Sequence, residues 1–175
     1  MSQYTIEPAR EEDIEQLAFI ERSAAALFPD DVISPEARAS VVPLELLIEA
    51  RLQGCLWVAL TPQQEPVGFI MAALEDGVGF IVEVDVLPHY QGRGLGRALI
   101  QRVVKWAHTE GLSRVTLTTF SKVRWNAPFY QRLGFKKIAT DELTPEFASK
   151  LANEGRRGLK ERVAMELLLA SDHKR

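Results

Sequence analysis

The stretch from residue 84 to residue 97 has the residue types and spacing best suited to chemistry. An apolar run leads into a turn with three glycines and then directly into a helix: Val84-Asp85-Val86-Leu87-Pro88-His89-Tyr90-Gln91-Gly92-Arg93-Gly94-Leu95-Gly96-Arg97. Glycines let a backbone approach a ligand closely and reach positive φ. The first turn of a helix offers unpaired N–H groups and partial positive charge. Together these features predict a site for phosphate oxygens.

Two common phosphate-binding motifs do not fit this turn. A Walker loop needs Gly-Lys-Ser/Thr, which is absent here. The dinucleotide fingerprint Gly-x-Gly-x-x-Gly fails, because Gly92 and Gly94 are followed by Arg97 at the third position. The next strand also ends in Thr118-Thr119 rather than in an acid for a ribose, so NAD binding is disfavoured. A glycine-rich turn that only starts a helix stays open as a structural alternative.

Two carboxylates lie on the strand that enters the turn. By strand alternation, Glu83 and Asp85 share one face, and Val82, Val84 and Val86 share the other. Carboxylates are expensive to bury without a cavity or partners, so this face is expected to line a wet, acidic cleft. Neighbouring like charges raise the pKa of one group, which suits a general base. A bulge in the strand would change which side chains share a face.

The acids could also have a purely structural role. Glu83 and Asp85 would serve equally as partners of cations such as Arg38 or Arg51 on the sheet surface. Three further acids could add to an acidic rim, although a solvated loop or helix face accounts for them as well: Glu21, Asp30 and Asp31.

Two sequence blocks resemble the GNAT superfamily of N-acetyltransferases. Gln91-Gly92-Arg93-Gly94-Leu95-Gly96 matches that family's acetyl-CoA signature, Arg/Gln-x-x-Gly-x-Gly/Ala. Asn126-Ala127-Pro128-Phe129-Tyr130-Gln131-Arg132-Leu133-Gly134-Phe135 is similar to its second signature, with the core Phe-Tyr-x-x-x-Gly-Phe. The blocks occur in the family's order and spacing, and the resemblance extends over roughly residues 3–138. The family often has an Asn seven residues before the tyrosine, but Val123 stands there, and Asn126 lies four before.

The resemblance implies an acyltransferase that moves the acetyl group of acetyl-CoA to a primary amine by direct attack in a ternary complex. An alkylammonium with a pKa of about 10.4 is only about 0.1% neutral at pH 7, so a nearby base is useful. Glu83 is the expected base, and Tyr130 is expected to protonate the departing sulfur; a packing aromatic is the alternative for Tyr130. The family resemblance also implies an oxyanion-binding N–H near Val86. The expected cofactor-binding residues are Val84, Val86, Gln91, Gly92, Arg93, Gly94, Leu95, Gly96, Arg97, Asn126 and Phe129.

The acceptor class stays open among three hypotheses. An acidic strand face favours a small cationic amine, but a protein or peptide amine fits it too. A non-catalytic acyl-CoA-binding module on the same fold would need only the glycine loop, so Glu83 and Tyr130 argue against that alternative. The resemblance further implies that a homodimer is a common state for such a chain.

The elements that must position these residues follow from hydrophobic periodicity and turn residues. Strands are expected at 4–6, 55–60, 67–74, 78–87, 115–119, 135–139 and 162–169. Helices are expected at 11–27, 43–52, 94–110, 128–133 and 144–153. A meander followed by two β-helix-β units predicts an α/β fold with a mixed sheet and the strand from Val78 in its middle. The resemblance implies about seven mostly antiparallel strands, flanked by helices, in a single domain over residues 1–175.

Bulk properties bound the remaining classes. The chain has 175 residues, 26% charged residues and a net charge of -3, which disfavours nucleic acid as a partner. The single cysteine, Cys55, excludes an internal disulfide and suits a reducing compartment. Neither a signal peptide nor an apolar run of ~18–20 residues is visible, so a cytoplasmic protein with no membrane contact is expected. The histidines lack metal-ligand spacing, and no metal site is expected.

Overall fold

Consecutive apolar strands build the first half of the sheet. β2 (Leu56–Leu60), β3 (Pro66–Glu75) and β4 (Val78–Val86) pair antiparallel with one another, and β1 (Thr5–Pro8) pairs antiparallel with β2. All five residues of β2 are buried, so this strand is covered on both faces. The computed structural model describes residues 3–170.

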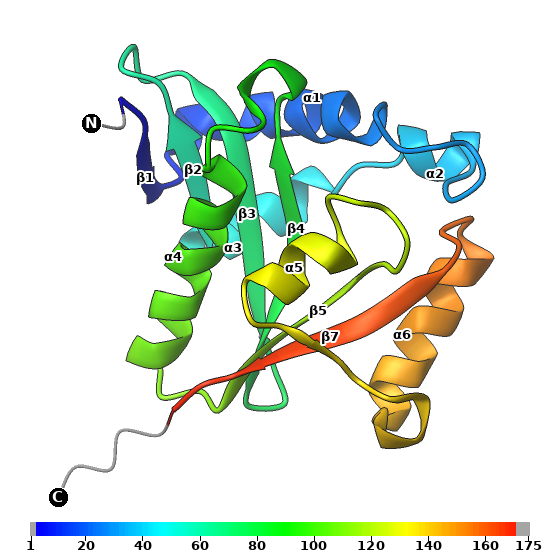
Figure 1. The fold of residues 1–175 in the computed structure, drawn as a ribbon. Coiled ribbons are helices and arrows are strands. Elements are labelled where there is room, and N and C mark those ends of the chain that lie inside the picture. Colours follow the sequence, from blue (N-terminus) through cyan, green and yellow to red (C-terminus); the bar gives the residue numbers. More distant parts are fainter. Residues whose placement is uncertain (1–2, 171–175) are drawn as a thin grey trace, which may run out of the picture.

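The second half of the sheet begins with the parallel addition of β5 (Arg114–Phe120) to β4. β7 (Arg162–Leu168) pairs antiparallel with β5, and the two-residue β6 (Lys136–Lys137) pairs with β7. The strand order is β1-β2-β3-β4-β5-β7-β6, with β4 in the middle (Figure 1). The prediction of a mixed, mostly antiparallel seven-stranded sheet is therefore confirmed.

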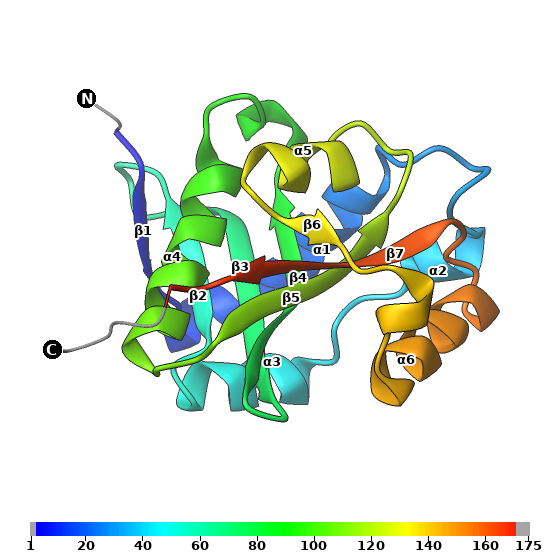
Figure 2. The ribbon, with the colours of Figure 1, turned by 60° about the horizontal axis from the view of Figure 1, so that its bottom comes forward.

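Helices cover both faces of the sheet. α4 (Leu95–Thr109) and α5 (Ala127–Arg132) pack on one face, and α1 (Ile14–Ala25) and α3 (Leu44–Leu52) pack on the other (Figures 1 and 2). The short α2 (Pro35–Ala39) follows α1, and α6 (Pro145–Arg156) precedes β7. Single 3-10 turns lie at Glu11–Asp13, Pro88–Tyr90 and Thr140–Glu142.

One short helix was not predicted, and two predicted elements have different boundaries in the structure. The prediction missed α2, because five residues are too few for a periodic pattern; Ser34 caps its start by accepting a bond from the Ala37 N–H (3.1 Å). The predicted strand 135–139 is reduced to two residues because a 3-10 turn begins at Thr140. The predicted helix 144–153 continues to Arg156.

A bulge in β4 corrects the predicted facing of its valines. Met71 pairs with Glu83 and Ala72 pairs with Ile81, so Val82 is the extra residue of the bulge. Val82 packs with the α1 and α3 cluster, whereas Val84 and Val86 pack with the α4 cluster. The prediction that all three valines share one face is therefore wrong for Val82.

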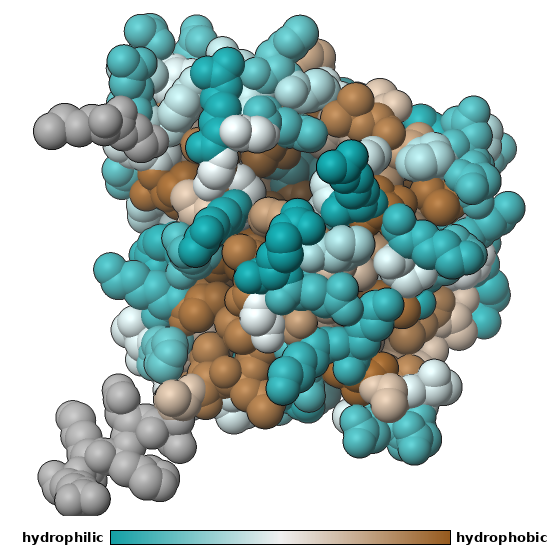
Figure 3. All heavy atoms as spheres, viewed as in Figure 1, coloured by the Kyte–Doolittle hydropathy of each residue, from teal (hydrophilic) through white to brown (hydrophobic). Residues whose placement is uncertain are grey.

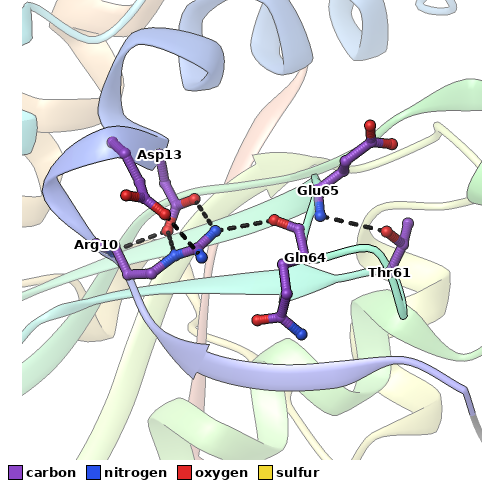
Figure 4. A network of polar contacts seen from close by, with 6 residues as sticks. Arg10, Asp13, Thr61, Gln64 and Glu65 are labelled. Atoms are coloured by element: carbon purple, nitrogen blue, oxygen red, sulfur yellow. Dashed lines mark hydrogen bonds and ion pairs between the residues drawn. The ribbon is translucent and has the colours of Figure 1, made fainter.

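A polar network fixes the start of α1 against the turn between β2 and β3 (Figure 4). Asp13 is fully buried and accepts bonds from the Arg10 N–H (2.8 Å), Nε (3.0 Å) and Nη2 (2.7 Å). The same Arg10 Nη2 donates to the Gln64 carbonyl (2.9 Å), and Glu65 N–H donates to the Thr61 hydroxyl (3.2 Å). The network thereby sets the position of the helix that carries Glu21 into the cavity described below.

The remaining surface features are ordinary for a folded domain. Figure 3 shows hydrophilic side chains spread over one face, with hydrophobic ones gathered in patches between them. Cys55 is buried just before β2, and burial raises the pKa of its thiol. Within residues 3–170, no helix is long and apolar enough to cross a membrane. No group of three His, Cys, Asp or Glu in that range is arranged to hold a metal ion.

Candidate active site

β4 and β5 part in the middle of the sheet. Their parallel pairing joins Gly79–Ile81 to Val115–Leu117, and within the described residues it ends there, although both strands continue. A cavity of about 620 Å³ lies at this fork and is lined by Val82–Val86 on one side and Thr118–Phe120 on the other. The fork therefore exposes main-chain groups of two central strands to one cavity.

The orientation of Val86 follows from the hydrogen bonds around it. Leu87 N–H donates to the Val67 carbonyl of β3 (2.8 Å), so the adjacent Val86 points its main-chain groups to the opposite edge of β4. The Val86 carbonyl accepts a bond from Gln91 Nε2 (3.1 Å), which agrees with that direction. The Val86 N–H is consequently directed toward the fork.

The glycine turn and the start of α4 form one end of the cavity. Gly92 and Gly94 have φ of 74° and 79°, and a Cβ on either would meet nothing within 4 Å. These glycines are thus required by the backbone conformation and leave open space in front of it. The first helical bond runs from the Ala98 N–H to the Gly94 carbonyl, so the three N–H groups before Ala98 precede the helical ladder.

The two arginines of the turn differ in position. Arg97 lines the cavity, and its side chain is exposed. Arg93 does not line it; its guanidinium donates to the Tyr4 hydroxyl (3.1 Å) and the His89 carbonyl (3.3 Å) and lies 5.4 Å from the Tyr90 ring centroid. The structure therefore brings every predicted cofactor-binding residue to the cavity except Arg93.

Glu83 and Asp85 face the cavity and are only partly exposed. Burial raises the pKa of both carboxyl groups, and the charge of Glu83 raises the pKa of Asp85 further. Asp85 Oδ2 is buried without a hydrogen-bond partner among the described residues. Neither Arg38 nor Arg51 pairs with these acids: Arg38 binds Asp30 (2.6 Å), and Arg51 forms no ion pair in the described part of the chain.

Glu21 joins the same acidic group from the facing helix. It is 8% exposed, lines the cavity, and accepts two bonds from the Val42 N–H (2.9 and 3.2 Å). Burial and the charge of Glu83 raise its pKa from 4.5 to about 8. Asp30 and Asp31 are exposed and do not line the cavity, so only Glu21 of the three contributes to it.

A charged network that the sequence did not reveal forms another wall. Glu154 of α6 accepts bonds from Thr118 Oγ1 (2.5 Å) and from Arg162 (3.3 Å), and both charged side chains are 14% exposed. Arg162 also donates to the Thr118 carbonyl (3.3 Å), and its charge lowers the pKa of Glu83. No local motif marks these two residues, because α6 and β7 meet β5 only in the folded chain.

Tyr130 lies in α5 across the cavity from the acidic strand. The ring is packed edge-on against Phe129 (5.4 Å) and Phe135 (5.8 Å), and the residue is 8% exposed. Burial, followed by the charges of Glu83 and Asp85, raises the pKa of the phenol above its ordinary value. The hydroxyl has no hydrogen-bond partner among the described residues, so it keeps its proton available to the cavity.

At the start of α5, Val123 stands where the family often has an asparagine, and Asn126 is the polar residue that lines the cavity. Val123 is 5% exposed and packs in an apolar cluster, so it offers no polar group. Asn126 instead lines the cavity, and its Oδ1 accepts a bond from Thr119 Oγ1 (2.6 Å). Its main-chain carbonyl accepts the Tyr130 N–H (3.0 Å). This pair of bonds links Tyr130 to β5.

Comparison with known proteins decides the family. A family model described as the acetyltransferase (GNAT) family matches residues 17–135. The chain belongs to the GNAT acetyltransferase family. Peptidyl-lysine N-acetyltransferase YjaB of Salmonella typhimurium is 30% identical over 139 residues, which cover 79% of this chain and 87% of that protein. This GNAT protein is therefore an acetyl-CoA-dependent N-acetyltransferase.

A second relative and one solved structure are also similar to this GNAT chain. Glucosamine 6-phosphate N-acetyltransferase of Trypanosoma brucei brucei is 41% identical over 59 residues, which cover 34% of this chain and 38% of that protein. The crystal structure of Rv2747 from Mycobacterium tuberculosis in complex with CoA has a TM-score of 0.68 at 22% identity, covering 95% of this chain and 99% of that one. At this identity the structural likeness concerns the fold, which it supports over nearly the whole chain.

The residues at the glycine end of the cavity fit acetyl-CoA as the co-substrate. Two glycines in left-handed conformations face open space, a helix begins there, and Arg97 adds a cation beside it. These donors suit a diphosphate. The fork between β4 and β5 continues from this end toward the acids and Tyr130.

Proposed function

We propose that this enzyme transfers the acetyl group of acetyl-CoA to the primary amine of a small cationic molecule, by direct attack in a ternary complex. The observation that carries the proposal is the grouping of Glu21, Glu83 and Asp85 at one cavity. None of the three forms an ion pair within 4.0 Å in the described part of the chain. Buried carboxylates without a cation favour a positively charged ligand.

The co-substrate would be held at the other end of the cavity. The N–H groups of the glycine turn and the first turn of α4 bind the diphosphate, and Arg97 adds charge; Arg93 supports the turn through Tyr4 and Tyr90 instead. Val84, Val86, Asn126 and Phe129 flank the path between the two ends. Bound acetyl-CoA supplies an activated thioester to this path.

Glu83 is the proposed general base. Its raised pKa is closer to the pKa of an alkylammonium than that of an ordinary glutamate is, so Glu83 accepts a proton from the ammonium more readily. Glu83 takes one proton from the ammonium, directly or through water, and leaves a neutral nitrogen nucleophile. This nitrogen attacks the carbonyl carbon of the thioester and forms the C–N bond, and the Val86 N–H, directed into the fork, donates to the carbonyl oxygen on which negative charge develops.

Tyr130 is the proposed acid toward the departing sulfur. The phenol is neutral at pH 7, and a thiolate whose thiol has a pKa near 8.5 accepts a hydrogen bond from it. The charges of Glu83 and Asp85 raise the pKa of the Tyr130 phenol, so protonation of Glu83 lowers that pKa. The C–S bond then breaks and Tyr130 gives its proton to the sulfur. The second proton of the attacking nitrogen returns to the Tyr130 oxygen, directly or through water, which leaves the acetylated amine, the CoA thiol and protonated Glu83.

A protein amine is the second candidate acceptor, because the YjaB relative is named a peptidyl-lysine N-acetyltransferase. The experiment that separates the candidates is a panel of amines with acetyl-CoA, followed by release of free CoA thiol. The panel contains monoamines, diamines, amino sugars, amino acids and lysine peptides. Turnover of small cationic amines above neutral or anionic ones is expected. Release of CoA with none of the amines would overturn the proposed function.

A further inference from the structure

The Thr118 carbonyl of β5 points toward β4 at the place where these two strands part. Ser121, directly after β5, donates its N–H to the carbonyl of Glu161, directly before β7 (2.8 Å). The odd-numbered residues of β5 therefore direct their main-chain groups to β7, and the even-numbered ones direct theirs to β4. Pairing with β4 ends at Leu117. The Thr118 carbonyl is thus the first carbonyl facing β4 beyond the paired segment.

A guanidinium from β7 takes the place of a strand partner for this carbonyl. Arg162 Nη2 donates to the Thr118 carbonyl (3.3 Å) and to the Thr118 hydroxyl (3.3 Å). Arg162 lies opposite Phe120 in the pairing of β5 with β7, and its guanidinium carbon is 4.5 Å from the centroid of the Phe120 ring. The Arg162 side chain therefore crosses β5 from the β7 side and ends at the edge that faces β4.

Glu154 of α6 holds the guanidinium in this position. Its carboxylate accepts bonds from Arg162 Nη2 (3.3 Å) and Nε (3.4 Å), and the Thr118 hydroxyl donates to it (2.5 Å). Both charged side chains are only 14% exposed and line the cavity, and Figure 1 shows α6 beside the start of β7. An ion pair that is largely removed from water adds little net stability, so stability alone does not account for this pair.

The two strands end their pairing by different means. On β4, the bulge places Val82 as an extra residue, and the Val86 N–H beyond it is directed into the fork. On β5, Arg162 occupies the Thr118 carbonyl. A main-chain carbonyl that loses its donor needs another one, and the strand that the Thr118 carbonyl faces is β4. The guanidinium therefore removes an incentive for β5 to pair further along β4.

We propose that Arg162 is a positioning residue of the transfer: it binds the Thr118 carbonyl, keeps β5 apart from β4, and so leaves the fork open to the thioester arm of acetyl-CoA. Arg162 acts through Thr118, and Glu154 holds it there. The inference rests on the proposed function, because it concerns how the same acetyl donor reaches the Val86 N–H.

The first test removes the guanidinium and its partner together, so that no unpaired charge is left behind. In the variant Arg162→Met with Glu154→Gln, the fork is expected to narrow. Calorimetry should then show at least about tenfold weaker binding of CoA. Binding of ADP should be unchanged, because ADP carries the diphosphate for the glycine turn but lacks the thiol arm. Equal losses for both ligands, or an unchanged CoA affinity, would overturn the inference.

Binding is the chosen readout because the charge of Arg162 also lowers the pKa of Glu83, which affects turnover by a second route. The matched control is the pair Arg114–Glu166, which also joins β5 to β7 (2.7 Å) but does not line the cavity. Arg114→Met with Glu166→Gln removes the same groups from the same two strands and should leave CoA affinity unchanged. A loss of CoA affinity equal to that of the first variant would contradict the assignment.

A crystal structure of the wild-type enzyme with CoA tests the assignment without any variant. The Arg162 guanidinium is expected to remain within about 3.5 Å of the Thr118 carbonyl, with the thiol arm of CoA between β4 and β5. A complex in which the guanidinium has left Thr118 while the fork stays open would overturn the inference. Both tests use CoA without an acceptor, so an amine panel that gives no CoA release would count against the proposed function alone.

Discussion

The carboxyl groups at the fork have an environment unlike that of a surface acid. Glu83 and Asp85 are desolvated, repel each other electrostatically, and lie within range of the Glu21 charge. Burial is the largest cause at each group and raises all three pKa values, although the hydrogen bond with Asp85 and the charge of Arg162 lower the pKa of Glu83. A bound ammonium reverses these effects, because it adds a positive charge where three negative charges would otherwise meet.

This arrangement predicts the pH dependence of the transfer. The base acts only when ionised, so kcat/KM rises with pH through a pKa above the ordinary carboxyl value of about 4.3. The charge of Glu83 raises the pKa of Glu21, so the two carboxylates repel each other when both are ionised, and Glu21→Gln is expected to move this rise to lower pH. Profiles of kcat/KM from about pH 5 to about pH 9 check it, with the exposed Glu15→Gln as control. Coincident profiles for wild type and Glu21→Gln would refute the coupling.

Tyr130→Phe tests the proposed acid. The ring packing against Phe129 and Phe135 is kept, and only the hydroxyl is lost. Turnover is expected to fall about 100-fold or more, the usual contribution of a general acid, while CoA affinity stays the same. Steady-state kinetics and calorimetric titration with CoA measure the two quantities. Unchanged turnover would leave Tyr130 as a packing aromatic.

Residue-level signals explain what the sequence could predict about the site. The glycine turn and the second block located one end of the cavity and Tyr130. Glu21 also carries a signal, because it continues the helical stripe of Ile14, Leu17 and Ala24, where a buried position is expected. An acid in an apolar stripe indicates a cavity, but the sequence alone favours a solvated helix face at that position.

At the scale of elements, the turn before α4 depends on backbone conformation. Gly94→Val places a branched residue at φ of 79°, in a conformation that costs about 1–2 kcal/mol, and puts its side chain into the open space before the helix. CoA affinity is expected to fall at least about tenfold, an effect of about 1.4 kcal/mol.

Gly111→Val is the matched control for this variant. Gly111 lies beyond the other end of the same helix, has φ of 70°, and also faces open space. Both variants should lose comparable stability by thermal denaturation, but only Gly94→Val should lose CoA affinity by calorimetry. Equal affinity in the two variants would remove the turn from the binding site.

The element order was predictable, and the local irregularities were not. Alternation and helical periodicity act over long segments, so the central sheet and the long helices were predicted. The bulge at Val82 depends on pairing with Met71 and Ala72, and the five residues of α2 depend on a serine cap. The Ile33–Leu159 bridge and the hydrogen bond from Thr118 to Glu154 are contacts between distant segments, which no local pattern specifies.

At the scale of the whole molecule, the buried Glu21 couples stability to pH. Its pKa is about 8 in the folded chain against 4.5 as the reference value. A group with a raised folded pKa contributes stability that is fully present below the unfolded pKa and is lost as pH rises through the folded one. The enzyme is therefore expected to lose stability between about pH 4.5 and about pH 8.

Glu21→Gln should reduce this loss, because an amide does not ionise. The melting temperature of the variant relative to wild type is expected to be higher at about pH 8.5 than at about pH 5. Scanning calorimetry at the two pH values measures it. A difference in melting temperature between the two proteins that is independent of pH would show that Glu21 ionises normally.

Homodimerisation stays a prediction from the family resemblance.

The burial of Cys55 has a practical consequence for optical assays. It is the only cysteine in the chain, it is 6% exposed, and its reactive thiolate is disfavoured by a raised pKa. A chromogenic disulfide reagent would consequently react with the thiol of released CoA and not with the folded protein, so its colour would measure CoA release alone. When the same reagent is added without CoA, slow development of the colour would measure the rate at which the core opens and exposes the Cys55 thiol.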